Sequence, residues 1–171
     1  MNTFLALSKA DQQEFINVLT IPGYEPSSRK FEPSVDTQYL TEYYTEYRSE
    51  KNSSIQSALA STTTWEAWTE YTYTLLGIDI FKIRIELGYN ADGNTVTSIN
   101  YNSAFVVKNL NPVVQSETIS CYAYISGGKA IAKAAWSYSL GPLQDLSVQI
   151  STIYGTLTSS PSGTSWDFYS A

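Results

Sequence analysis

Residues 77–90 read GIDIFKIRIELGYN, and apolar and polar side chains alternate along most of this stretch. A β-strand points successive side chains to opposite faces of a sheet, so the alternation predicts a strand with one face in a core. Residues 90–94 (NADGN) then have the composition of a tight turn, and residues 95–107 return to strand-like composition. Together these segments predict an antiparallel β-hairpin.

Further strand-like segments continue to the C-terminus, separated by breaks at residues 109–112, 126–129, 141–142 and 159–163. We expect five or six strands of roughly 8–13 residues, joined by turns. A single flat sheet would leave one apolar face in water. The sequence therefore predicts a mainly β fold over residues 64–171, either an antiparallel two-layer β-sandwich or a barrel-like meander. Small residues in AIAKAAW (130–136) would let a neighbouring layer approach one strand closely.

Residues 1–63 follow a different pattern, and we expect an N-terminal helical segment that packs on the β domain. Residues 4–19 place apolar side chains broadly on one helical face, with Ser8 or Asp11 as the N-cap. Residues 21–34 contain three prolines and are expected to be a connector over the domain surface.

The segment TEYYTEYRSE (residues 41–50) fits two kinds of secondary structure. With a period of two, Thr and Tyr alternate along one strand face, as their β propensity favours. With helical spacing, Tyr39, Tyr43 and Tyr47 lie four residues apart, Asp36 is an N-cap, and the following residues continue the helical pattern. We predict a helix over residues 36–50 that lays its tyrosines on the β domain, with a strand as the alternative.

The composition excludes several classes of function. The chain has 171 residues, a formal net charge of −6, no His and one Cys. The acidic balance argues against nucleic-acid partners and anionic membrane surfaces. The absence of His removes His-dependent catalytic triads and His-ligated zinc. Cys121 lies within an apolar alternation and is interpreted as a small buried side chain.

The location of the protein is inferred from composition. No apolar run is long enough for a membrane span, and residues 1–13 lack the basic start of a signal peptide. Few charges and many Ser and Thr residues are typical of bacterial secreted and surface proteins. We therefore expect an extracellular or cell-surface protein whose leader lies outside this sequence.

Three other possible sites have simpler explanations. Two carboxylate pairs, Asp79 with Glu86 and Glu66 with Glu70, could serve a glycoside hydrolase, but no motif selects either pair. Residues 90–94 carry side-chain oxygens at alternate positions, as the first part of a calcium-binding loop does. A hairpin turn is sufficient to explain this composition. Residues 52–54 (NSS) match the N-glycosylation pattern, which occurs often by chance in a Ser-rich chain. We predict no enzymatic activity, no metal and no cofactor.

The aromatic residues are the stronger indication of function, because Tyr and Trp suit carbohydrate stacking and protein contact. For each of them, packing in the core is the alternative. The candidate ligand-binding residues are Trp65, Trp68, Tyr71, Tyr73, Tyr122, Tyr124, Trp136 and Tyr138. We expect a non-enzymatic protein that binds a glycan or a protein partner. The alternatives are a toxin-like or bacteriocin-like effector and, less favoured, a carboxylate-based glycoside hydrolase.

Overall fold

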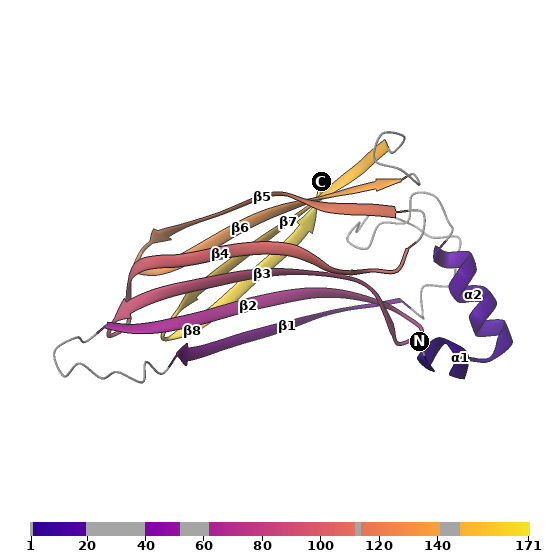
Figure 1. The fold of residues 1–171 in the computed structure, drawn as a ribbon, viewed down its shortest axis with the longest axis horizontal. Coiled ribbons are helices and arrows are strands. Elements are labelled where there is room, and N and C mark those ends of the chain that lie inside the picture. The colour runs from indigo at the N-terminus through magenta and orange to yellow at the C-terminus, as the bar shows by residue number, and fades with distance from the viewer. Residues whose placement is uncertain (1, 20–39, 52–61, 112–113, 141–147) are drawn as a thin grey trace.

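The computed structural model describes residues 2–19, 40–51, 62–111, 114–140 and 148–171, and within them it is a β-sandwich. Helices α1 (Asn2–Ala6) and α2 (Lys9–Leu19) precede the strands. The strands are β1 (Leu40–Lys51), β2 (Thr62–Leu75), β3 (Ile78–Asp92), β4 (Thr95–Asn109), β5 (Val114–Ser126), β6 (Lys129–Leu140), β7 (Val148–Ser160) and β8 (Gly163–Ser170). They form two antiparallel sheets, β1-β2-β3-β4 and β5-β6-β7-β8, which are stacked in two layers (Figure 1). The predicted β-sandwich is confirmed.

The predicted hairpin around residues 90–94 is also confirmed. Strands β3 and β4 pair directly, with Asp92 opposite Thr95 and a two-residue turn between them. Gly93 in this turn has a φ of 55°, a left-handed conformation that glycine adopts without steric cost. The turn between β2 and β3 uses Leu76 at a φ of 52°, where glycine or asparagine would be expected.

The alternation of β3 divides its side chains as the sequence indicated. Ile83, Ile85 and Leu87 are fully buried between the sheets, while Lys82, Arg84 and Glu86 lie on the other face of the same strand. The small side chains of β6, among them Ala132 and Ala134, belong to the same core, so the alanine-rich strand faces the opposite sheet. The helices instead lie at one end of the sandwich, beside the β2–β3 turn (Figure 1).

The helix predicted over residues 36–50 is wrong across Leu40–Lys51, which form strand β1. This strand pairs antiparallel with β2 over its full length, from Leu40 opposite Leu75 to Lys51 opposite Thr64. The Tyr44 ring packs on Tyr71 and Trp166, and the Tyr47 ring stacks on Trp68 at 5.6 Å on the other face. Cross-strand aromatic contacts and the β propensity of Thr and Tyr therefore outweigh the helical spacing.

The N-terminal helical segment agrees with the sequence analysis, although it is divided in two. Leu7 and Ser8 separate α1 from α2. Ser8 caps α2, because its Oγ accepts a hydrogen bond from the backbone N–H of Asp11 at 3.1 Å. The Phe4 and Phe15 rings lie 5.2 Å apart, and Phe15 joins the hydrophobic core. The connector expected over residues 21–34 lies outside the described residues.

Side chains join the two sheets along both open edges. Along one edge, Arg48 Nη1 donates to the carbonyl of Ser160 at 3.0 Å, and Trp166 Nε1 donates to Glu46 Oε2 at 3.0 Å. Along the other edge, Thr118 Oγ1 donates to the carbonyl of Ala104 at 3.0 Å. Because both edges are joined, the broad surfaces that the sandwich presents to solvent are the outer faces of its two sheets.

A buried tyrosine of this core is expected to make the fold less stable at alkaline pH. Burial raises the pKa of the Tyr73 phenol to about 12, above the value of about 10 that applies in an unfolded chain. The stability that Tyr73 contributes is therefore fully present below about pH 10 and is lost as pH rises through about 12. We expect the unfolding free energy to fall by up to about 2–3 kcal/mol over this window from Tyr73 alone.

Urea unfolding at a series of alkaline pH values tests this prediction. A Tyr73→Phe variant should lose stability less steeply than the wild type, while a Tyr122→Phe variant, changed at an exposed ring, should follow the wild type. Some decrease of the unfolding free energy with pH should remain in Tyr73→Phe, because burial also raises the pKa of Tyr89. If the unfolding free energy falls equally steeply with pH in the wild type and in Tyr73→Phe, the prediction is contradicted.

Candidate functional site

The eight aromatic candidates from the sequence divide between the core and the surface. Tyr71, Tyr73, Trp136 and Tyr138 are buried, so for these four the core-packing alternative holds. Trp65 and Trp68 are half-buried on opposite faces of β2. Tyr122 and Tyr124 are exposed on the outer face of β5. The structure therefore does not bring the eight residues together in one site.

The outer face of β1–β4 is occupied by its own side-chain contacts. The guanidinium of Arg84 lies 4.3 Å from the centre of the Trp68 ring, and its Nη1 contacts Glu86 Oε1 at 3.1 Å. Its Nε donates to Glu70 Oε1 at 2.8 Å, and Lys82 Nζ lies 3.4 Å from the same carboxylate group. These contacts pair Arg84 and Lys82 with the carboxylates of Glu70 and Glu86.

The carboxylates nominated for catalysis all belong to such pairs. Glu70 and Glu86 share Arg84, and Asp79 lies 3.4 Å from Lys82. Glu66 accepts a hydrogen bond from the Tyr101 hydroxyl and contacts Lys51 at 3.0 Å. The Tyr101 hydrogen bond and Lys51 hold the pKa of Glu66 below its ordinary value. A general acid needs the opposite shift, so the environment of Glu66 does not suit that role.

Both outer faces carry exposed aromatic rings, but their contacts differ. On β1–β4, Lys51 lies over the Tyr101 ring and Arg84 over the Phe105 ring, whereas the exposed rings of β5–β8 contact one another. Tyr122 and Tyr124 project from β5, Tyr154 from β7 and Tyr169 from β8; we call these four residues the tyrosine face. The rings of Tyr122 and Tyr124 stack at 6.3 Å, and those of Tyr154 and Tyr169 stack at 5.2 Å. Tyr122 is 54% exposed and Tyr169 is 52% exposed, so much of each ring is available for contact.

The strand register places small and polar side chains between these two tyrosine pairs. Ala135 on β6 lies opposite Ser120 of β5 and Tyr154 of β7. Lys133, two residues earlier on β6, lies opposite Tyr122 and Thr156. The result is a shallow groove of about 250 Å³, with tyrosines on both sides, a small methyl group on its floor and hydroxyls beside it.

The size of the groove limits the kind of ligand it can accept. Pockets that enclose a whole drug-sized molecule usually measure about 300–1,000 Å³. A groove of about 250 Å³ is instead large enough for one ring of a longer chain whose other units lie on the flanking tyrosines.

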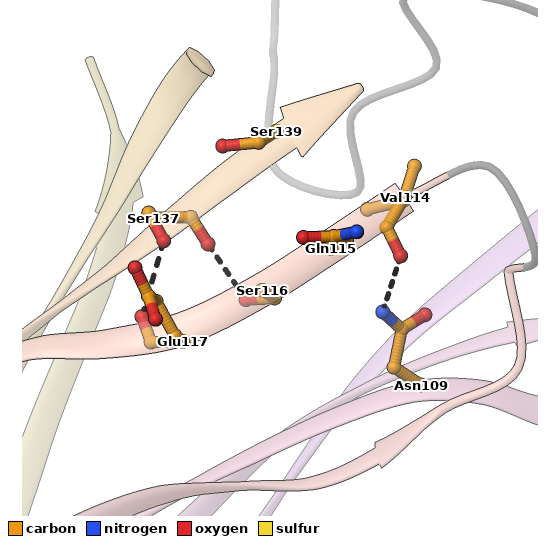
Figure 2. A pocket seen from close by; sticks show the side chains of 7 residues that line it. All are labelled: Asn109, Val114, Gln115, Ser116, Glu117, Ser137 and Ser139. Atoms are coloured by element: carbon orange, nitrogen blue, oxygen red, sulfur yellow. Dashed lines mark hydrogen bonds between the residues drawn. The ribbon is translucent and has the colours of Figure 1, made fainter. Parts of the chain in front are cut away.

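A larger polar hollow of about 600 Å³ lies where β4, β5 and β6 come together (Figure 2). Its described lining consists of Asn109, Val114, Gln115, Ser116, Glu117, Ser137 and Ser139. Several of these side chains bond to the neighbouring backbone. Ser116 Oγ donates to the carbonyl of Ser137 at 2.7 Å, and Asn109 Nδ2 donates to that of Val114 at 2.9 Å. These bonds join the strand ends and engage the Ser116 and Asn109 side chains. The tyrosine face, with its exposed rings, is the better candidate for a site that stacks on a ligand.

The interpretation of Cys121 as a small buried side chain holds in part. It is half-buried and packs against the core, and its Sγ accepts a hydrogen bond from Asn102 Nδ2 at 3.0 Å. Burial raises the pKa of the Cys121 thiol, which disfavours the reactive thiolate.

The turn at residues 90–94 and the glycosylation pattern give no support for further sites. The Asn90 amide is directed to the outer face of its sheet, where it exchanges hydrogen bonds with Asn100 at 2.9 and 3.0 Å. In the described part of the chain, no three His, Cys, Asp or Glu side chains form a group that could hold a metal ion. The pattern at residues 52–54 lies outside the described residues.

Sequence reasoning found Tyr122 and Tyr124 but missed Tyr154 and Tyr169. The latter two lie in separate strands, and their sequence separation gives no sign of contact. Their pairing follows from the β7–β8 register, which places Tyr154 directly opposite Tyr169. The turn at Pro161–Ser162 sets the β7–β8 register, and the alternation along each strand sets which side chains share a face. Together these two signals in the sequence indicate that Tyr154 and Tyr169 are neighbours.

Comparison of this chain with models of protein families, with curated proteins and with solved structures gave no match. Among the described residues, no helix is long and apolar enough to cross a membrane.

Proposed function

We propose that this protein is a non-enzymatic, exported or cell-surface protein that binds a glycan through the tyrosine face. The groove between the two stacked tyrosine pairs is the observation that carries this proposal. Sugar rings have apolar faces that pack on aromatic rings, and their hydroxyls need polar partners at the sides. The groove offers both, because Ser120 and Thr156 lie beside the rings. The hydroxyl-rich, charge-poor composition supports an exported location.

A glycan fits this face better than a protein partner does. The centre of a protein–protein interface is usually depleted of charged residues, and a stable interface buries about 800 Å² on each partner. Lys133 lies at the centre of the tyrosine face, where such a contact would have to remove it from water. A narrow glycan can instead use the lysine ammonium as a hydrogen-bond donor.

Binding to a panel of immobilised oligosaccharides and cell-wall polymers tests the proposal. We expect the wild type to bind at least one glycan, and Tyr122→Ala and Tyr154→Ala each to weaken that binding by about tenfold. Tyr47→Ala is the matched control, because Tyr47 is also an exposed, stacked tyrosine but lies on the outer face of the other sheet. It should bind like the wild type.

Circular dichroism should show that all three variants are folded. The proposal fails if no glycan binds, or if Tyr47→Ala reduces binding as much as the two groove variants do.

A further inference from the structure

Lys133 is the cation at the centre of the tyrosine face. It lies between Tyr122 and Thr156 in the strand register and lines the groove. Among the described residues, no carboxylate comes within ion-pair distance of its Nζ. Asp167 occupies the same row of the sheet but lies two strands away from Lys133, which is roughly 10 Å at the usual strand spacing. Among the described residues the ammonium group therefore has no carboxylate partner and can pair with an external anion.

Protection of a sheet edge does not account for Lys133. Lysines often protect the edge strands of a sheet against pairing with other chains. Strand β6 is a central strand, paired with β5 on one side and β7 on the other, so it needs no such protection. Lysine also has a low preference for strands. Lys133 points to the solvent side of the sheet, as polar side chains of an antiparallel sheet with one buried face usually do, and its place beside the tyrosine rings makes its charge available to a ligand in the groove.

We propose that the groove selects an acidic sugar, with the carboxylate of that sugar paired to Lys133 and the neighbouring sugar rings packed on the tyrosines. This inference rests on the proposed glycan binding and adds the class of glycan. One lysine balances one carboxylate, whereas the net charge of −6 disfavours densely sulfated or phosphorylated polymers. The expected ligand therefore carries isolated carboxylates along an otherwise neutral chain.

A panel of neutral and acidic oligosaccharides tests this inference when it includes uronic-acid oligomers as free acids and as their methyl esters. Esterification removes the charge and keeps the sugar, so the free acid should bind about fivefold to tenfold more tightly than the ester. Lys133→Gln should abolish this difference, whereas Lys133→Arg should retain it. Higher salt concentration should weaken binding of the free acid to the wild type but not to Lys133→Gln.

The outcomes separate this inference from the function on which it rests. If the tightest ligands are neutral, or if Lys133→Gln keeps the preference for the free acid, the acidic-sugar inference is overturned and glycan binding stands. If no member of the panel binds, both proposals fail. Tyr122→Ala should weaken the acid and the ester by the same factor, because the ring contacts do not depend on charge.

Discussion

Replacing Trp136 with Ala is expected to lower the free energy of unfolding by about 3–5 kcal/mol, because the change deletes a large, fully buried side chain. The Trp136 ring fills the centre of the core and stacks against Phe168 at 6.1 Å. Urea unfolding followed by far-UV circular dichroism measures the loss. Tyr122→Ala removes an exposed ring of the outer face and should change stability by less than about 0.5 kcal/mol.

Gly155 provides a second test of the same packing. A Cβ at this position would lie 2.9 Å from the Trp136 ring and 2.8 Å from the Phe168 ring. Gly155→Ala alone should therefore cost about 1–3 kcal/mol. In the Trp136→Ala background the contact with Trp136 is gone, and the Phe168 ring, which stacks on Trp136, gains room to move away from the added methyl group. The cost of Gly155→Ala should therefore fall by at least about 1 kcal/mol. This account of the core is contradicted if the effects of Gly155→Ala and Trp136→Ala on the unfolding free energy are additive, or if Trp136→Ala alone costs less than about 1.5 kcal/mol.

The fold class could be predicted from the sequence because its strongest signal is local. The alternation of residues 77–90 and the turn after it fix a strand, a face and a hairpin without knowledge of other segments. Strand β1 could not be assigned in this way. Its tyrosines satisfy helical and strand periodicities alike, and only the pairing of Tyr44 and Tyr47 with rings on other strands selects the strand.

The candidate site was predictable only in part. The alternation along β5 marks Tyr122 and Tyr124 as sharing one face, but it does not say whether that face is inside or outside. Trp136 and Tyr138 have the same spacing on β6 and point into the core. Which face of a strand is buried depends on the cross-strand register and on the opposite sheet, and neither is encoded within a single segment.

Replacing Arg84 with Met is expected to lower the free energy of unfolding by about 2–4 kcal/mol, because it leaves a carboxylate of low exposure without its main partner. The Glu70 side chain is only 7% exposed, and Arg84 contacts it through both Nε and Nη2. Lys82 remains 3.4 Å from Glu70, which keeps the loss below that for a fully isolated charge. Urea unfolding at neutral pH measures the change.

The double variant Glu70→Leu/Arg84→Met separates the cost of an unpaired charge from the value of the ion pair itself. Apolar replacement of a buried ion pair is often neutral or stabilising, so this variant should recover most of the loss. Lys51→Met is the matched control on the same face, because its pair with Glu66 is more exposed. Such exposed pairs contribute about 0–1 kcal/mol. If the double variant is as unstable as Arg84→Met, the guanidinium stabilises this face through its contact with Trp68 rather than through the neutralisation of Glu70.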